Sequence, residues 1–236
     1  MNKRKNIKDI YLLKNKRKIV SISCGVSSLA KIADNHVDII LVGDSIGMTI
    51  YGLDNTLKVT LQMIINHGKA IVNSTIKSFI VLDMPFGTYE QSKEKAFANA
   101  SKLLSKTGAQ AIKLEGGQEL GDTIKYLSNR GIPVMGHVGL MPQRINISGG
   151  FATQGKTDIS SKKIINDAKF LTTSGAFSIV LEAIPEKLGK IITSEISIPT
   201  IGIGGGRYCD GQILVLEDLL GIDKSFNPKY LKKYAN

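Results

Sequence analysis

The chain has 236 residues, and 31 lysine and arginine side chains against 20 acidic ones give a formal net charge of +11. The excess lies at the two ends, because residues 1–18 carry a net charge of +7, residues 224–236 carry +4, and the chain between them is neutral. No apolar run approaches the roughly 20 residues of a membrane-spanning helix, and the first residues lack the apolar centre of a signal peptide. We therefore expect a cytoplasmic protein without a membrane partner.

The composition argues against a nucleic-acid partner in spite of the basic ends. Of the 31 cationic side chains only 5 are arginines, the residue type that favours bidentate phosphate and base contacts. Tryptophan is absent and aromatic residues make up 6% of the chain, which leaves little for base stacking. We expect no nucleic-acid partner, and a non-catalytic protein that binds nucleic acid through its ends stays open only as an alternative.

Eight short apolar runs follow one another along the chain, separated by segments with helical spacing. Each run is four or five residues long and continuously apolar, as in strands covered on both faces of a parallel sheet. This order predicts a single (β/α)8 TIM barrel over residues 1–236, with a doubly wound open sheet as the structural alternative. The runs are 19–23, 38–42, 79–82, 111–114, 133–136, 178–181, 199–203 and 212–216. The clearest helical segments are 61–72, 90–106, 119–130, 161–174 and 185–195.

Polar or glycine-rich residues end six successive runs, at the strand ends where a barrel places its chemistry. One acid after a strand is more often a helix cap or a turn residue, but six such ends in succession predict a site. Asp44, Asp83 and Glu115 would meet at one mouth of the barrel, where they repel one another unless a cation lies between them. Oxygen ligands without cysteine favour Mg²⁺ as that cation.

Three further side chains at strand ends extend the predicted site. Lys113 shares a strand face with Glu115, so it could bind an anionic substrate or form only a structural ion pair with that acid. Glu182 ends the sixth run and is placed to act as a base toward a carbonyl substrate polarised by the metal, the arrangement that forms an enolate. His137 ends the fifth run and could hydrogen-bond the substrate or pack as a structural histidine.

Two glycine-rich segments compete with this interpretation. Residues 150–157 read Gly-Phe-Ala-Thr-Gln-Gly-Lys-Thr and match the Walker A pattern, which needs a hydrophobic strand directly before it. A polar, proline-containing stretch precedes them instead, so we interpret the segment as a loop. The glycine run 202–206 lacks the dinucleotide-binding spacing, and it could be an anion-binding loop of the barrel or a tight turn.

Several long motifs resemble the ketopantoate hydroxymethyltransferases, also called 3-methyl-2-oxobutanoate hydroxymethyltransferases. They occur in the order and with the spacing of that family, from about residue 8 to residue 234. The motifs are LVGDSIGMTIYGLDNTLKVTL (41–61), VLDMPFGTY (81–89), GAQAIKLEGG (108–117), GIPVMGHVGLMPQ (131–143), LEAIPEKL (181–188) and IPTIGIGGGRYCDGQIL (198–214).

The resemblance implies a Mg²⁺-dependent barrel enzyme of pantothenate and coenzyme A biosynthesis. Such an enzyme transfers a hydroxymethyl group from 5,10-methylenetetrahydrofolate to 3-methyl-2-oxobutanoate and forms 2-dehydropantoate. Carried over by motif, Asp44 and Asp83 would be the metal ligands, and Glu115 would lie near the ion through a water molecule.

The same motifs imply the residues that contact the keto acid. Ser45 and Lys113 would bind it beside the metal ligands, and Glu182 would remove the proton from its carbon 3. The chain departs from the family at Gly25 and Val26, where an aromatic residue and an aspartate are usual after the first strand.

The resemblance also implies a quaternary state and leaves a second enzyme class open. The family's usual decamer implies a homo-oligomer, although this barrel is expected to have a shortened C-terminal end. The alternative enzyme is another Mg²⁺-dependent keto-acid barrel of the phosphoenolpyruvate mutase or isocitrate lyase type, which would need no folate donor.

Overall fold

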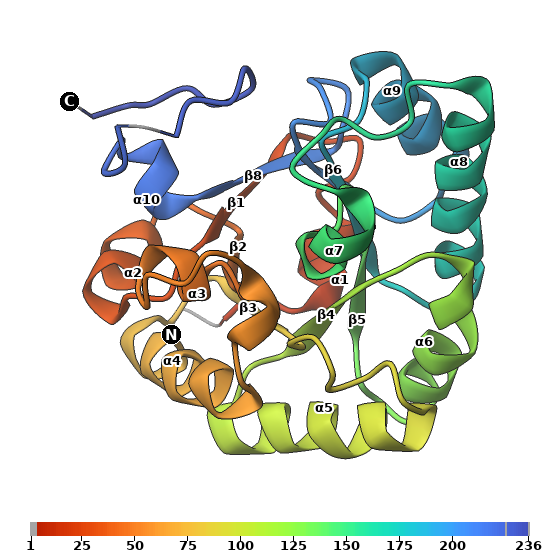
Figure 1. Cartoon of the computed structure of the whole chain (residues 1–236). Coiled ribbons are helices and arrows are strands. Elements are labelled where there is room, and N and C mark those ends of the chain that lie inside the picture. Colours follow the sequence, from red (N-terminus) through yellow and green to blue (C-terminus); the bar gives the residue numbers. More distant parts are fainter. Residues whose placement is uncertain (1–3, 225, 236) are drawn as a thin grey trace.

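A closed barrel of eight parallel strands forms the centre of the computed structural model, which describes residues 4–224 and 226–235. The strands follow one another around the barrel in chain order, and β1 closes the ring by pairing with β8 (Figure 1). The predicted (β/α)8 TIM barrel is thereby confirmed. The strands are β1 (Ile19–Ser23), β2 (Ile39–Val42), β3 (Phe79–Asp83), β4 (Ala111–Glu115), β5 (Val134–Gly139), β6 (Ser178–Glu182), β7 (Thr200–Ile203) and β8 (Gly211–Val215).

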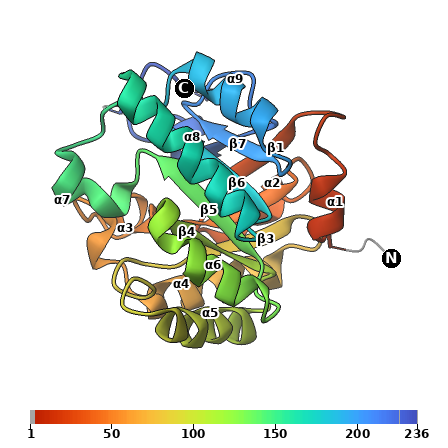
Figure 2. The same cartoon turned by 90° about the vertical axis from the view of Figure 1, so that its right-hand side faces the viewer.

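Helices surround the barrel and cover the outer faces of its strands (Figures 1 and 2). The α-helices are α1 (Ile7–Tyr11), α2 (Ser27–Ala33), α3 (Ile46–Thr49), α4 (Leu61–Ser74), α5 (Lys93–Thr107), α6 (Gly121–Ser128), α7 (Ile145–Ser148), α8 (Asp158–Thr173), α9 (Glu186–Glu195) and α10 (Leu216–Leu219). The short 3₁₀ segments are η1 (Thr56–Lys58), η2 (Gln118–Leu120) and η3 (Pro142–Arg144). None of the helices in the described ranges is long and apolar enough to cross a membrane.

Helix α5 illustrates how the local sequence sets these elements. Ser92 caps its start by accepting a hydrogen bond from a backbone N–H of the first turn. Gly108 ends it with φ +78°, a left-handed conformation that glycine adopts without strain. Ala96, Ala100 and Leu103 recur at helical spacing and form the buried face. The helix therefore lies on the barrel with its polar side outward.

Alternation along each strand divides the barrel interior into an apolar and a polar end. On β3, Phe79 and Val81 belong to the inner apolar cluster, and Asp83 follows two residues later on the same face. Register pairs Asp83 with Lys113 of β4, and Glu115 lies two residues beyond Lys113. Because all strands are parallel, these polar side chains meet at the C-terminal mouth.

The basic N-terminal segment closes the opposite end of the barrel. Helix α1 lies across that end, away from α3 and α7 (Figure 2), and its Ile10 is fully buried in the inner cluster. The Arg17 guanidinium donates to both carboxylate oxygens of Asp38 at 2.7 and 2.8 Å, and the Lys14 ammonium lies 2.7 Å from Asp210. Part of the excess positive charge is therefore used in structural contacts.

The structure departs from the sequence-based boundaries in the second half of the barrel. Strand β5 continues to Gly139, so His137 lies inside the strand instead of directly after it. Residues 204–210 connect β7 to β8 without a helix. Helix α7 precedes residues 150–157, and Thr157 caps α8, so the strand that a Walker A loop requires is not in front of this segment.

Gly189 of α9 offers a test of the packing between this helix and the loop after β7. A β-carbon at Gly189 would overlap the backbone carbonyl oxygen of Gly205, which cannot rotate away as a side chain could. We expect Gly189→Ala to lower the free energy of unfolding by about 1–3 kcal/mol, the usual cost of overpacking. Urea denaturation measures this change.

Ser194→Ala, on the exposed face of the same helix, is the matched control. Its free energy of unfolding should stay within about 0.5 kcal/mol of that of the original chain. Equal stabilities of the two variants would contradict the close approach.

Candidate active site

A cavity of about 330 Å³ opens at the C-terminal mouth of the barrel. Its walls come from the ends of the strands and from the loops that follow them. All the side chains that the sequence singled out as candidates lie in its lining, which includes Asp44, Ser45, Asp83, Lys113, Glu115, His137 and Glu182.

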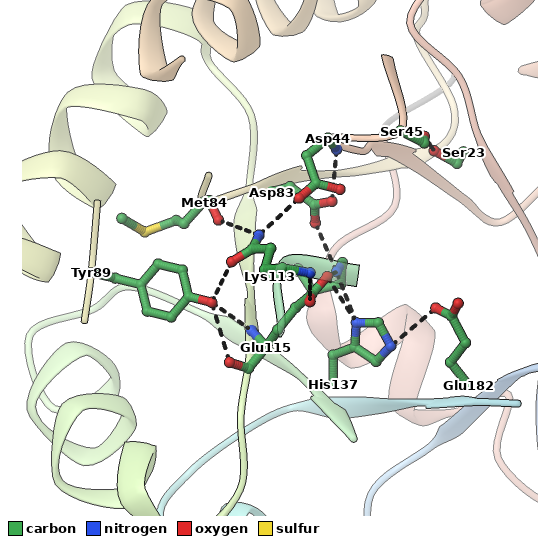
Figure 3. A network of polar contacts seen from close by, with 11 residues as sticks. Ser23, Asp44, Ser45, Asp83, Met84, Tyr89, Lys113, Glu115, His137 and Glu182 are labelled. Atoms are coloured by element: carbon green, nitrogen blue, oxygen red, sulfur yellow. Dashed lines mark hydrogen bonds and ion pairs between the residues drawn. The ribbon is translucent and has the colours of Figure 1, made fainter. Parts of the chain in front are cut away.

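Lys113 is the centre of this polar cluster (Figure 3). Its ammonium lies 3.2 Å from Asp83 Oδ1, 3.3 Å from Glu115 Oε1 and 3.1 Å from His137 Nδ1, and the residue is 4% exposed. Burial lowers the pKa of Lys113, but the charges of Asp83, Glu115 and Asp44 outweigh it and raise the pKa above the usual value. The lysine is thus a buried cation shared by several acids, which is more than an ion pair with Glu115 alone.

Asp44 and Asp83 form a pair of buried carboxylates beside this lysine. The backbone N–H of Asp44 donates to Asp83 Oδ2 at 2.9 Å. Asp83 Oδ1 is buried without an aligned hydrogen bond from the described residues, although the Lys113 ammonium is near it. Burial, together with repulsion from Asp83 and Glu115, holds the pKa of Asp44 well above its usual value. The cluster therefore holds carboxyl groups that repel one another, and a bound cation would relieve this repulsion.

The donor set fits a divalent cation that keeps part of its water shell. Within residues 4–224 and 226–235, no three His, Cys, Asp or Glu side chains converge into a complete ligand cage. Asp44 and Asp83 offer carboxylate oxygens, and the excess of acid favours a doubly charged ion. Mg²⁺ is commonly bound by one or two carboxylates while water and substrate complete its octahedron.

Glu115 differs from the two aspartates because both of its oxygens already have partners. Oε1 lies near the Lys113 ammonium and His137 Nδ1, and Oε2 accepts a hydrogen bond from the Gln143 backbone N–H at 3.0 Å. Burial would raise the pKa of Glu115, but the neighbouring charges of Lys113 and His137 and these hydrogen bonds lower it to about 2. Glu115 is therefore a permanently charged group, suited to contact a cation through water.

His137 bridges two acids from different strands. Its Nδ1 is 3.3 Å from Glu115 Oε1, and its Nε2 is 3.1 Å from Glu182 Oε2 (Figure 3). Burial and the charge of Lys113 lower the pKa of His137, but the contacts with the two acids prevail and raise it to about 9. Both ring nitrogens contact protein side chains. We therefore expect His137 to act on Glu182 and not directly on a molecule in the cavity.

The backbone around Glu182 is tightly held. The Leu140 N–H donates to the Glu182 carbonyl at 2.9 Å, and Gly139 allows this approach because a β-carbon there would overlap that oxygen. Ala183 follows with φ +47°, an uncommon left-handed backbone for a residue with a side chain, and its N–H donates to Ile203. The carboxyl group of Glu182 is more open than the rest of the cluster, with 14% of the side chain exposed.

Three residues of the polar network were missed in the sequence. The hydroxyl of Ser23 lies 3.1 Å from that of Ser45, which is only half-buried. Tyr89 and Gln143 are buried against the carboxylate cluster and contact it through hydrogen bonds. Both belong to the motifs quoted above, but neither follows a strand directly, so the search at strand ends did not select them.

The departure at Gly25 has a local structural explanation. A β-carbon on this residue would lie 2.5 Å from Ile46 Cγ2 and 2.8 Å from Ile50 Cδ1. The two isoleucines therefore occupy the space beside the first strand end into which a larger side chain would project.

The C-terminal part of the chain lines the outer rim of the cavity. Ile222, Phe226 and Tyr230 contribute apolar surface there, and Glu217 and Asp218 of α10 contribute acids. The rim is thus more apolar than the carboxylate cluster at its base.

The comparisons with known proteins agree over almost the whole chain. The family model described as ketopantoate hydroxymethyltransferase matches residues 4–236. The 3-methyl-2-oxobutanoate hydroxymethyltransferase of Paramagnetospirillum magneticum is 47% identical over 99% of this chain and 85% of that protein. The enzyme of the same name from a Ruegeria species is 49% identical over 96% of this chain and 81% of its own length.

A similar fold occurs in proteins of much lower sequence identity. The crystal structure of phosphonopyruvate hydrolase in complex with oxalate and Mg²⁺ superimposes with a TM-score of 0.69, over 93% of this chain and 84% of that one. Its sequence identity is 11%, so this likeness concerns the fold.

Asp218 at the cavity rim provides a test of the electrostatics. Burial, and then the charges of Glu217 and Asp223, raise its pKa to about 6, against roughly 3.9 in an unfolded chain. Between these values the folded chain retains a proton that the unfolded chain has lost, so the free energy of unfolding falls as the pH rises from about 4 to 6. Asp218→Asn replaces the carboxyl group by a neutral amide, so the variant does not lose this free energy of unfolding as the pH rises.

We expect the variant to be more stable by roughly 1 kcal/mol at neutral pH, a value reduced for the partial exposure of the group. The gain should vanish below pH about 4, where the carboxyl group is protonated in both states. Urea denaturation at several pH values measures it, and a gain that does not change with pH would contradict the assigned shift.

Proposed function

The chain belongs to the ketopantoate hydroxymethyltransferase family, and we propose that the cavity at its barrel mouth is where 3-methyl-2-oxobutanoate receives a hydroxymethyl group from 5,10-methylenetetrahydrofolate. The product is 2-dehydropantoate, an intermediate of pantothenate biosynthesis. The observation that carries the proposal is the position of Glu182, whose partly open carboxyl group lies across the cluster from Asp44 and Asp83 (Figure 3).

Asp44 and Asp83 would hold the divalent cation, which we propose to be Mg²⁺. Bound there, the ion would supply Lewis-acid polarisation of the keto-acid carbonyl. Glu115, whose oxygens are already paired, would contact the ion through water. The repulsion of Asp44 by Asp83 and Glu115, together with the buried Asp83 Oδ1 that lacks an aligned hydrogen bond, supports this assignment.

The keto acid would be bound by residues beside the metal ligands. Lys113 supplies a buried positive charge at the base of the cavity for an anionic substrate. The half-buried hydroxyl of Ser45 can donate a hydrogen bond to the carboxylate of the substrate. The Ser23 hydroxyl, 3.1 Å from that of Ser45, helps to orient it. His137 would act on the substrate indirectly, because it touches Glu182.

Glu182 would be the base of the reaction. Its carboxylate accepts the proton from carbon 3 of the keto acid, and the electron pair of that C–H bond delocalises onto the carbonyl oxygen. Carbon 3 then bonds to the methylene carbon of the folate, and the electron pairs of the two broken C–N bonds stay on the folate nitrogens. A water molecule supplies the oxygen and one hydrogen of the new hydroxyl group. Its second proton and the proton taken up by Glu182 go to the two folate nitrogens. His137 Nε2 lies 3.1 Å from Glu182 Oε2, and this contact holds the Glu182 carboxylate toward the cavity.

The family membership favours this activity over a phosphoenolpyruvate mutase or isocitrate lyase type of reaction. Solved structures of that class share the fold with this chain at only 10% and 11% sequence identity. We further propose that the barrel acts as one catalytic domain. The homo-oligomer, the decamer and the cytoplasmic location stay predictions.

The role of Glu182 can be tested on the first chemical step alone. In D₂O with Mg²⁺, the enzyme should catalyse exchange of the carbon 3 hydrogen of 3-methyl-2-oxobutanoate for deuterium. Glu182→Gln removes the base without changing the size of the side chain, and we expect the exchange rate, measured by proton NMR, to fall at least about 100-fold.

Glu186→Gln is the matched control, because Glu186 lies outside the cavity at the start of α9. This variant should exchange at the original rate. Undiminished exchange in Glu182→Gln would remove Glu182 as the base.

The substrate requirement separates the two enzyme classes. We expect dehydropantoate formation to require 3-methyl-2-oxobutanoate, the folate donor and Mg²⁺ together, because the transferred carbon comes only from the folate. A chromatographic assay in which each component is left out in turn measures this. A product formed from the keto acid without any folate would support the mutase or lyase alternative.

A further inference from the structure

Gln143 connects the two sides of the carboxylate cluster, and the proposed mechanism assigns it no role. It lies in η3, the short turn that follows β5, and it is 4% exposed. Its side-chain amide nitrogen donates to Asp44 Oδ2 at 2.8 Å, and its backbone N–H donates to Glu115 Oε2 at 3.0 Å. One residue thus contacts acids from two separate strand ends.

The orientation of the Gln143 amide is determined by its neighbours. The amide nitrogen also donates to the Met84 carbonyl at 3.0 Å, so two acceptors face the NH₂ group. On the other side, the Tyr89 hydroxyl donates to Gln143 Oε1 at 2.6 Å (Figure 3 shows Tyr89, Met84 and Asp44 around this position). A flipped amide would set its oxygen against a carboxylate and a carbonyl, with no donor between them.

These contacts determine which carboxylate oxygens remain free. Asp44 Oδ2 is engaged by the Gln143 amide, and Asp83 Oδ2 is engaged by the Asp44 N–H. Among the described residues, Asp44 Oδ1 remains for a cation, together with Asp83 Oδ1, which the Lys113 ammonium approaches to 3.2 Å. Without the amide, the Asp44 carboxylate could rotate, and its repulsion by Asp83 and Glu115 would favour such a rotation.

We propose that Gln143 is a positioning residue that orients Asp44 and Glu115 for a divalent cation, and that Tyr89 acts through it by holding the amide in one orientation. The proposal rests on the metal role assigned to Asp44 and Asp83 in the proposed function. Residues that orient metal ligands typically change metal affinity by about 10- to 100-fold when they are replaced.

The decisive measurement is the affinity for a cation, read without catalysis. Mn²⁺ prefers the same oxygen ligands as Mg²⁺ and can be followed by electron paramagnetic resonance. Gln143→Met keeps the length of the side chain and the backbone N–H but removes the amide donor. We expect it to weaken Mn²⁺ binding about 10- to 100-fold. Gln62→Met makes the same chemical change on the exposed face of α4, and it should bind Mn²⁺ as the original chain does.

Tyr89→Phe tests the second half of the proposal and remains informative if Gln143→Met does not fold. It removes only the hydroxyl, which holds Gln143 Oε1 and also contacts the backbone N–H and carbonyl of Glu115, so we expect a smaller loss of Mn²⁺ affinity, of a few fold. In the Gln143→Met background the same change should lower the affinity by less than it does in the original chain, because the amide that it orients is gone. If the two substitutions lowered the Mn²⁺ affinity by fully additive amounts of free energy, Tyr89 would not act through Gln143.

The outcomes separate this proposal from the proposed function. If the original chain binds no Mn²⁺, the metal role of the aspartates fails, and the positioning role fails with it. If the original chain binds Mn²⁺ and folded Gln143→Met and Tyr89→Phe bind it equally well, only the positioning role is overturned. A purely structural role would lower the thermal midpoint of these variants while the Mn²⁺ affinity of the folded protein stayed unchanged.

Discussion

The Lys113 ammonium is buried among acids that come from three strand ends, and the polar mouth of the barrel depends on its charge. A buried carboxylate without a partner costs several kcal/mol, so Asp83 and Glu115 could not remain ionised beside Asp44 without this cation. Asp44 and Asp83 nevertheless repel each other, because Lys113 is shared among the acids. This repulsion makes the mouth suitable for a divalent cation and, with that cation in place, for an anionic keto acid.

The barrel holds this charged cluster in place by separating it from an apolar interior. Phe79 and Val81 fill the barrel beneath Asp83, and Ile10 of α1 is buried at the far end, so apolar side chains separate the acids from that end. Because the strands are parallel, their polar positions lie at the same end of the barrel. Loop residues such as Gln143 then connect separate strand ends. The site is therefore largely organised before any substrate binds, which reduces the entropy that binding must overcome.

Much of the fold and part of the site followed from local patterns. The apolar runs predicted all eight strands, because a strand covered on both faces is continuously apolar whatever its neighbours are. Asp83, Glu115 and Glu182 were found because barrel chemistry lies at strand ends. The position of His137 inside β5 was not predicted, since a histidine between glycine and valine carries no boundary signal. Gln143 was not predicted either, because a turn after a strand has no periodicity from which to infer its contacts.

By itself, the sequence determined the order of strands and helices, the end of the barrel that carries the acids, and the family through its motifs. Only the tertiary structure decided which polar atoms meet. Gln143 and Asp44 are 99 positions apart, and Lys113 and His137 are 24 apart, yet each pair is within hydrogen-bonding distance. Closure of the barrel sets these distances, because strand register and side-chain alternation act together around the whole ring. Local sequence specifies each strand, but the sharing of a buried charge among several strands exists only once they are assembled.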